Sequence, residues 1–463
     1  MCGICGFVGH PEEKGLLSSM QSTLVHRGPD DNGTYVQPGI ALGHTRLSII
    51  DLATGHQPIH NEDNTLWIVF NGEIYNYLDL REDLVKKGHQ FYTKSDTEVI
   101  IHLYEEEGED FVRHLNGEFA IALWDVPRQR LLLARDRLGI RPLYYYSSGG
   151  LFLFASEIKA LLVTGRIEKQ FNHLALGDYL TLRYVPGNDT LFQGVRKVPP
   201  ASILIYEKSG FNISSYWGLS YQPKMRSHEE LEEGFCSLLE DSVKRRMMSE
   251  VPLGAFLSGG VDSSVIVALM TRYSSEPVKT FSIGFGTDID ELDEAKVIAD
   301  YLGCDHEELV TGKQDYTLLP KIVRQMDEPL GDAIIIPTYL LAQATARKVK
   351  VVLTGEGADE VLGGYVHQLT MHFGDKYNNA IPGYLQDANL ALLRFLPPSV
   401  LERFFPYPAR LGVKGKTKLL NYLSHLKSAS RAYLDLAGLF SDQEKEELFT
   451  RDFLDNIAGD GTL

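Results

Sequence analysis

The chain has few cysteines: Cys2, Cys5, Cys236 and Cys304 are the only four among its 463 residues. Four cysteines in a chain of this length do not make a disulfide framework. No second C-x-x-C and no paired histidines follow Cys2 and Cys5 at zinc-ligand spacing. The pair also does not stand between a strand and a helix, as a thioredoxin-like motif would. We therefore favour neither a metal site nor a redox disulfide at this pair.

Positive charge and long apolar runs are also scarce. Lys and Arg number 45 against 62 Asp and Glu, and the formal net charge is -17. Such a chain repels phosphate backbones, so we expect no nucleic acid partner, although one loop can still bind a nucleotide. The start lacks the basic and apolar segments of a signal peptide, and no apolar run is long enough to span a bilayer. We expect a cytoplasmic protein without a membrane partner, and we consider a homodimer.

Two patterns divide the chain. In the first part an amphipathic helix is predicted over 97–115, and hairpins over 119–136 and 142–157. These favour a layered α+β domain over 2–212. The polar, turn-rich stretch 206–227 is predicted to be a linker. From 228 to 463 short apolar strands alternate with helices, which predicts an α/β domain with a doubly wound parallel sheet.

Two loops rich in glycine and acids follow strands of the second domain. LSGGVDSS (257–264) leads into a helix, and its glycines, serines and helix start suit a phosphate. It is not a Walker A loop, because G-x-x-x-x-G-K-[ST] is absent. TGEGADEVLGGY (354–365) carries clustered carboxylates, which suit Mg²⁺. A helix cap and an exposed turn are the alternative interpretations, but two such loops on neighbouring strand ends favour a binding site.

Several motifs resemble known families. MCG at the start, RGPD (27–30), RLSI (46–49), FNGEIYN (70–76) and SDTE (95–98) resemble the class II glutamine amidotransferases. SGGVDSS resembles the SGG-x-DS signature of the ATP pyrophosphatases. The amidotransferase motifs followed by the ATP-pyrophosphatase motif resemble the glutamine-hydrolysing asparagine synthetases. This resemblance extends from residue 1 to at least about residue 365. The resemblance implies a four-layer αββα N-terminal-nucleophile sandwich, an ATP-pyrophosphatase sheet, and carbon–nitrogen ligation using glutamine, aspartate, ATP and Mg²⁺.

The resemblance also implies roles in the first domain. Met1 would be removed, so that the α-amine of Cys2 can act as base for its own thiol, which attacks the side-chain amide of glutamine. Asn71 and Gly72 resemble an oxyanion hole. Residues matching those that hold glutamine are Arg46, Asn71, Glu73 and Asp96, although a surface ion pair is the commoner role of any single charge. We expect Cys5 to be a buried strand residue, and Cys236 and Cys304 to be packing residues.

In the second domain the resemblance implies an ATP site and a metal site. The ATP-binding residues would be Leu257, Ser258, Gly259, Gly260, Asp262, Ser263, Ser264, Ile283, Thr354, Gly355 and Glu356. The metal ligands would be Asp262 and Asp359. Members of the family continue with further helices and a lysine that meets the phosphates, so we expect the domain over 228–463 to be incomplete. Two alternatives stay open: an amidotransferase acting on another carboxylate, and a glutaminase or regulatory protein without synthetase activity.

Overall fold

The computed structural model describes residues 1–9, 14–286, 290–401, 412–451 and 453–454. Its contacts divide the chain into two compact units. The first comprises Met1–Phe171, Gly187–Glu328 and Ala333–Thr354, and the second comprises Asn172–Pro186, Pro329–Asp332 and Gly355–Leu463. Each unit is described by itself.

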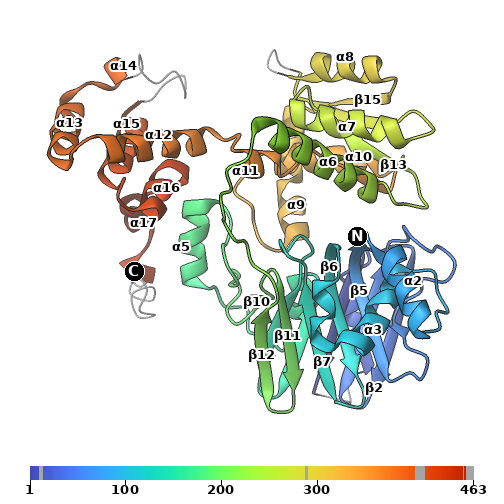
Figure 1. Cartoon of the computed structure of the whole chain (residues 1–463). Helices are drawn as coiled ribbons and strands as arrows, with labels where there is room; N and C mark the ends of the chain where they lie inside the picture. Colours follow the sequence, from blue (N-terminus) through green and yellow to red (C-terminus); the bar gives the residue numbers. More distant parts are fainter. Residues whose placement is uncertain (10–13, 287–289, 402–411, 452, 455–463) are drawn as a thin grey trace. The chain divides into compact units, whose positions relative to one another are not determined.

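Two antiparallel six-stranded sheets form one part of the first unit (Figure 1). The first sheet has the order β10 (Arg196–Lys197), β8 (Tyr144–Ser148), β9 (Leu151–Ala155), β1 (Gly3–Val8), β3 (Ile40–Arg46), β2 (Asp31–Gln37). The second has the order β12 (Gly210–Ser215), β11 (Ser202–Glu207), β7 (Arg130–Arg135), β6 (Gly117–Asp125), β5 (Leu66–Ile74), β4 (Ile59–His60).

The alternation of side chains along these strands builds three apolar layers. In β6, Ala120 and Ala122 face the first sheet, and Phe119 and Ile121 face the other way. The layer between the sheets contains residues of both, such as Ile4 and Val69 in the group Ile4, Leu42, Val69, Leu133, Phe152 and Phe154. Two faces are therefore buried on every central strand, which explains the nearly continuous apolar runs of β6, β7 and β9.

Helices cover both outer faces. Residues of α1 (Lys14–Ser22) and α4 (Ile158–Leu162), such as Met20 and Leu161, pack on the first sheet. Residues of α2 (Tyr77–Lys87) and α3 (Asp96–Glu107), such as Leu84 and Ile100, pack on the second, together with the short 3₁₀ helix η1 (Gly108–Arg113). The predicted four-layer αββα sandwich is confirmed.

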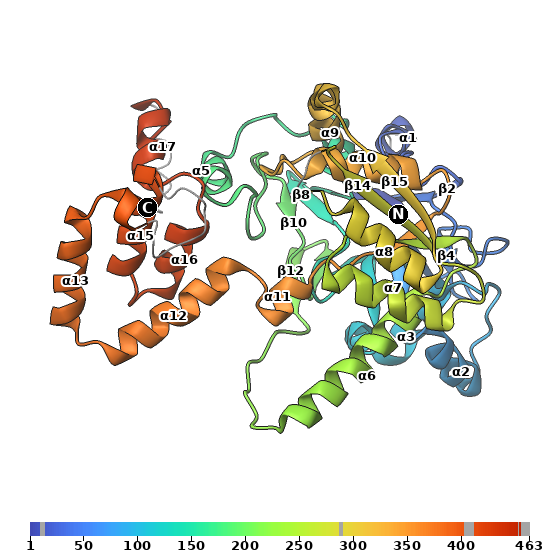
Figure 2. The same ribbon diagram turned by 90° about the horizontal axis from the view of Figure 1, so that it is seen from above.

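The first unit also contains a parallel sheet with the order β15 (Asp305–Val310), β14 (Lys279–Gly284), β13 (Leu253–Phe256), β16 (Val351–Leu353). Helices α6 (His228–Arg246), α7 (Val261–Tyr273) and α8 (Leu292–Leu302) pack on one face (Figure 2). Helix α10 (Ile335–Thr345) packs on the other face, through Leu341 against Phe281. Between them in sequence lie η2 (Lys313–Leu318) and α9 (Leu319–Met326). The prediction of a doubly wound parallel sheet is confirmed.

The second unit is helical throughout its described residues. It contains α5 (His173–Leu182), α11 (Ala358–Leu362), α12 (Val366–Ala380), α13 (Gly383–Phe395), α14 (Pro398–Leu401), α15 (Gly412–Ser424), α16 (Ala429–Ala437) and α17 (Asp442–Leu448). Its core gathers around Tyr422, Leu426 and Ala432. In both units, no described helix is long and apolar enough to cross a membrane.

The structure corrects four details of the sequence interpretation. The predicted linker is wrong over its first part, because residues 210–215 form β12, paired with β11. The edge strand β15 was not predicted, and its residues are largely exposed, so it lacks the apolar alternation of a buried strand. The helix predicted over 97–115 gives way to 3₁₀ geometry at Gly108. Cys236 is exposed on α6 and does not pack, whereas Cys5 is buried and Cys304 packs as expected.

Candidate functional site

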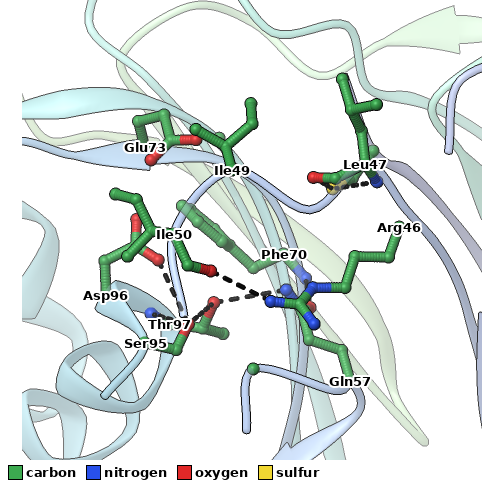
Figure 3. A pocket seen from close by; sticks show the side chains of 13 residues that line it. Arg46, Leu47, Ile49, Ile50, Gln57, Phe70, Glu73, Ser95, Asp96 and Thr97 are labelled. Carbon is green, nitrogen blue, oxygen red and sulfur yellow. Dashed lines mark hydrogen bonds between the residues drawn. The ribbon is translucent and has the colours of Figure 1, made fainter. Parts of the chain in front are cut away.

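A pocket opens where β1 begins and β3 and β5 end, beside the start of α3 (Figure 3). Five residues named from sequence line it together: Cys2, Arg46, Gly72, Glu73 and Asp96. The remaining lining residues are Leu47, Ile49, Ile50, Gly55, Gln57, Phe70, Ser95 and Thr97. Asn71 lies between the lining residues Phe70 and Gly72 on β5.

The thiol of Cys2 is held at one edge of this pocket. Its Sγ accepts a hydrogen bond from the backbone N–H of Leu47 at 3.4 Å and lies 3.7 Å from the carbonyl oxygen of Leu47. Arg27 of the RGPD motif donates from Nε to the carbonyl of Cys2 at 2.9 Å, and its Nη1 donates to Glu157 at 2.9 Å. Burial raises the pKa of the Cys2 thiol, so the thiol is neutral at pH 7 and requires a base to become a nucleophile.

Burial makes a terminal amine at this place a weaker base than usual. In the described chain the amine belongs to Met1, and burial lowers its pKa to about 5. The nearby guanidinium of Arg27 also lowers this pKa, whereas the neighbouring Cys2 raises it. An amine in this environment is mostly unprotonated at neutral pH and can accept a proton.

Asn71 offers an unused hydrogen-bond donor. Its side chain is 1% exposed, and its Nδ2 has no hydrogen-bond partner among the described residues. Leaving a buried donor unpaired costs about 1–3 kcal/mol, so such groups in native proteins call for an explanation. A bound ligand with an oxygen at this point would supply the missing acceptor.

Arg46 brings a buried positive charge to the pocket. Its Nη2 donates to the carbonyl oxygens of Ile50 at 3.0 Å and Asp51 at 2.6 Å, and its residue is 6% exposed. No ion pair of Arg46 occurs among the described residues. Gly55 makes room for this guanidinium, because a Cβ there would lie 2.4 Å from Nη2 of Arg46. Sequence reasoning missed Gly55, since no local pattern marks it.

Two carboxylates, Glu73 and Asp96, lie across the pocket from Arg46 (Figure 3). Burial raises the pKa of Asp96 to about 6, although hydrogen bonds from the backbone of Ile74 (2.9 Å) and from Oγ of Ser95 (3.3 Å) oppose this. Burial, and then the charge of Asp96, raises the pKa of Glu73. Two acidic groups that repel each other favour a cation between them. With Arg46 opposite, the pocket suits a ligand that carries both an ammonium and a carboxylate.

The loop that carries Ile49 and Ile50 is anchored from both sides. Asp30 of the RGPD motif accepts from the backbone N–H of Ser48 at 2.9 Å and pairs with Lys350 at 2.6 Å. Glu250 accepts from the backbone N–H of Asp51 at 3.0 Å, and its own N–H donates to Ile49 at 3.1 Å. Glu250 lies three residues before the parallel strand β13, and Lys350 directly precedes β16. No sequence motif indicated this connection.

The parallel sheet brings the first predicted ATP loop and part of the second to one edge. Because β13, β14 and β16 are parallel and in register, Leu257, Ile283 and Thr354 lie at the same ends of their strands. Gly260 is the N-cap of α7, so the N–H groups of Val261 and Asp262 have no intrahelical acceptor. Such groups at a helix start suit an anion.

The loop 257–264 is held by its own hydroxyls. Ser263 is buried, and its Oγ accepts from the N–H of Ser258 at 3.1 Å and contacts Oγ of Ser258 at 3.0 Å. Oγ of Ser264 donates to the carbonyl of Gly260 at 2.6 Å. We expected these serines to donate to phosphate; in this structure they make bonds within the loop. Gly259 is needed because a Cβ there would lie 2.4 Å from Cβ of Glu294.

The remaining predicted residues, Gly355, Glu356 and Asp359, belong to the second unit. Glu356 is exposed, and Asp359 lies in the first turn of α11. The carbonyl of Asp359 accepts from the N–H groups of Gly363 at 2.9 Å and Gly364 at 3.0 Å, which closes the turn after α11.

The αββα sandwich with an N-terminal cysteine at its pocket, followed by a parallel sheet with a glycine-rich phosphate-type loop, defines a glutamine amidotransferase joined to an ATP-pyrophosphatase domain. Residues 1–217 match the family described as glutamine amidotransferase domain, and residues 234–454 match the family described as asparagine synthase.

Relatives of known name agree with this class. The chain is 40% identical to asparagine synthetase [glutamine-hydrolyzing] 1 of Bacillus subtilis, over 78% of this chain and 59% of that protein. It is 37% identical to putative asparagine synthetase [glutamine-hydrolyzing] 2 of Methanocaldococcus jannaschii, over 83% of this chain and 79% of that protein. It is also 35% identical to amidase chry2 of Gibberella zeae, over 79% of this chain and 59% of that protein. The chain belongs to the family of glutamine-hydrolysing asparagine synthetases.

Proposed function

We propose that the chain makes asparagine in the cytoplasm from aspartate, glutamine and ATP. Glutamine is hydrolysed in a domain over 2–212, and the ammonia attacks an activated aspartate in a domain over 228–463. The observation that carries the proposal is the pocket beside Cys2. It combines a thiol with opposite charges at Arg46 and at Glu73 with Asp96, and the unpaired buried amide donor of Asn71 lies on β5 between two of its lining residues. The chain spans 59% of the length of the Bacillus relative.

The first step is attack on glutamine by Cys2. With Met1 removed, the α-amine of Cys2 in its neutral form takes the proton of the thiol. Sγ bonds to the side-chain amide carbon of glutamine. The carbonyl oxygen becomes an oxyanion, which the side-chain N–H of Asn71 and the backbone N–H of Gly72 stabilise.

The tetrahedral intermediate then collapses. The carbon–nitrogen bond breaks, the α-ammonium returns its proton to the leaving nitrogen, and ammonia departs. Water hydrolyses the remaining thioester to glutamate and restores the thiol. Arg46 binds the carboxylate of glutamine, and Asp96 with Glu73 binds its ammonium, which places the amide carbon at Cys2.

The second reaction activates aspartate at the edge of the parallel sheet. A side-chain carboxylate oxygen of aspartate bonds to the α-phosphorus of ATP, and pyrophosphate leaves toward the loop 257–264. Ammonia attacks the acyl carbon of the β-aspartyl adenylate, and AMP leaves with the bonding electrons. Leu257, Ile283, Thr354, Gly355 and Glu356 contact the nucleotide in this proposal.

Mg²⁺ is the metal that the carboxylates of the two glycine-rich loops suit. Asp262 is exposed in the first turn of α7, and Asp359 is half-exposed in the first turn of α11. Carboxylate oxygens are the ligands of Mg²⁺, and the ion neutralises charge on phosphate oxygens when it is bound. We assign Asp262 and Asp359 as its ligands.

The test is an assay of pyrophosphate release that depends on both aspartate and glutamine, with asparagine measured in parallel. Equal amounts of asparagine, pyrophosphate and AMP support the proposal. If pyrophosphate forms only when a different carboxylate is supplied, that carboxylate and not aspartate is the acceptor. Glutamate formed steadily with no pyrophosphate from any acceptor would refute synthesis and leave a glutaminase.

A further inference from the structure

A second group of chemistry-bearing side chains lies outside the pocket, on the helical layer of the second sheet. Glu62 follows β4, His89 follows α2, and His102 and Glu105 lie on α3. Each of the four offers one ligand atom, and the four atoms all lie within 4.8 Å of one another. His102 is completely buried, and the side chain of His89 is 14% exposed. The proposed glutamine chemistry uses none of these residues.

The spacing of these atoms is that of ligands around one small ion. Nδ1 of His102 lies 2.8 Å from Glu105 and 3.6 Å from Glu62. Nδ1 of His89 lies 3.5 Å from Glu105 and 3.8 Å from Glu62. A tetrahedral Zn²⁺ with bonds of about 2.0–2.2 Å holds neighbouring ligand atoms roughly 3.3–3.6 Å apart. Two of the four distances, 3.5 and 3.6 Å, are close to this range, and the 3.8 Å contact of His89 is to Oε1 of Glu62.

The surroundings already orient the two carboxylates. Oε1 of Glu62 accepts from the backbone N–H of Gln90 at 2.9 Å, and Oε1 of Glu105 accepts from Nδ2 of Asn61 at 2.8 Å. The other oxygen of each carboxylate, Oε2, is the one that faces Nδ1 of His102. Each glutamate therefore has one oxygen fixed by the protein and one directed at the centre of the cluster.

Both histidines also face a carboxylate with the ring nitrogen that points away from the centre. Nε2 of His89 lies 3.1 Å from Glu106, and Nε2 of His102 lies 3.7 Å from Glu98. Backbone N–H groups of Tyr92 and Thr93 in turn hold the carboxylate of Glu98. A carboxylate behind a histidine fixes its tautomer and orients its ring at most zinc sites.

The local charge also calls for a cation. Four carboxylates, those of Glu62, Glu98, Glu105 and Glu106, surround two imidazoles. Lys87, which pairs with Glu106 at 2.8 Å, supplies one positive charge. Three negative charges remain, and either protons on both imidazoles or one divalent ion would neutralise two of them. Imidazole together with carboxylate favours Zn²⁺ over Mg²⁺ or Ca²⁺, which prefer oxygen ligands alone.

We propose that Glu62, His89, His102 and Glu105 bind one Zn²⁺ in a closed, structural site. The ion joins three segments that are separate in sequence: the connection between β4 and β5, the end of α2, and the second half of α3. It thereby fixes the connection from α2 to α3, which leads directly into Ser95 and Asp96 of the glutamine pocket. The site is separate from the magnesium site proposed above and does not depend on the proposed function.

The test uses the full chain with Cys2→Ala and Cys236→Ser, so that the pocket thiol and the exposed thiol cannot bind metal. After chelation and dialysis, Zn²⁺ alone is titrated in competition with a chromophoric chelator, and Co²⁺ is added for visible spectroscopy. We expect one equivalent of Zn²⁺, a rise in melting temperature with Zn²⁺, and Co²⁺ bands of tetrahedral intensity without thiolate charge transfer.

Graded variants locate the ion. His89→Ala and Glu62→Ala should weaken Zn²⁺ binding more than Glu106→Ala, which should weaken it about 10–100-fold because Glu106 only orients His89. His114→Ala, a change at an exposed histidine outside the cluster, should leave affinity unchanged. If His89→Ala does not fold, the zinc affinity of Glu62→Ala is compared with that of His114→Ala, because the side chain of Glu62 is 38% exposed and its removal disturbs packing less.

Two results would overturn the proposal. One is the absence of stoichiometric Zn²⁺ after dialysis. The other is equal affinity in His89→Ala, Glu62→Ala and His114→Ala. The first result would mean that the chain has no zinc site, and the second that Zn²⁺ binds at other residues.

Discussion

Replacing Asn71 by alanine should slow glutamine hydrolysis without weakening glutamine binding. Nδ2 of Asn71 is buried and has no partner among the described residues, so it is free for a ligand oxygen, and we expect its hydrogen bond to form fully only to the oxyanion. An interaction present only in the transition state changes kcat and leaves KM alone. Removing one such donor costs about 2.7–4 kcal/mol, which is about a 10²–10³-fold loss of kcat. The resting protein loses little stability through this nitrogen, since no hydrogen bond of Nδ2 is broken.

The assay is steady-state glutamate production, with ammonia-dependent asparagine synthesis measured on the same preparation. We expect the first to fall and the second to stay, because only glutamine chemistry needs the oxyanion hole. Asn212→Ala is the matched control, as Asn212 is an exposed asparagine of the same sheet, on β12. A raised KM with unchanged kcat would refute the reasoning and make Asn71 a binding residue. An equal loss of both activities would show general damage instead.

Four further outcomes are expected. Cys2→Ala should abolish glutamine use and spare ammonia-dependent synthesis, and Asp262→Ala should do the reverse; glutaminase activity kept by the first, or ATP turnover kept by the second, would contradict the assignments. Gly55→Ala should raise KM for glutamine at least about 10-fold, because its Cβ would displace the guanidinium of Arg46; an unchanged KM would remove Arg46 from the binding site. KM for glutamine should rise as pH falls through about 6, since Asp96 then takes up a proton and no longer attracts the ammonium. A carboxyl group with such a raised pKa titrates roughly between pH 5 and 8. A KM that does not change with pH over this range would refute the role of Asp96.

Regular, doubly buried elements were predictable from sequence. The hairpin of β6 and β7 and the helix α7 follow patterns that extend over many residues, and the structure contains each of them. Edge strands were not predictable, because β12 and β15 are exposed on both faces and carry no alternation. Such a strand is stabilised by backbone hydrogen bonds to the neighbouring strand, and the local sequence does not show which strand that neighbour is.

The candidate site likewise has features that the sequence predicts and features that only the tertiary structure shows. The sequence by itself determined which motif residues belong together, since five of those named for glutamine chemistry line one pocket. Only the tertiary structure decided that Asn71 has an unpaired donor, that Gly55 makes room for Arg46, and that Glu250 holds the loop at Ile49. The cluster of Glu62, His89, His102 and Glu105 likewise has no regular spacing. Periodicity records which face of a strand or helix is buried, whereas a site forms from side chains of separate elements, whose approach depends on how those elements pack.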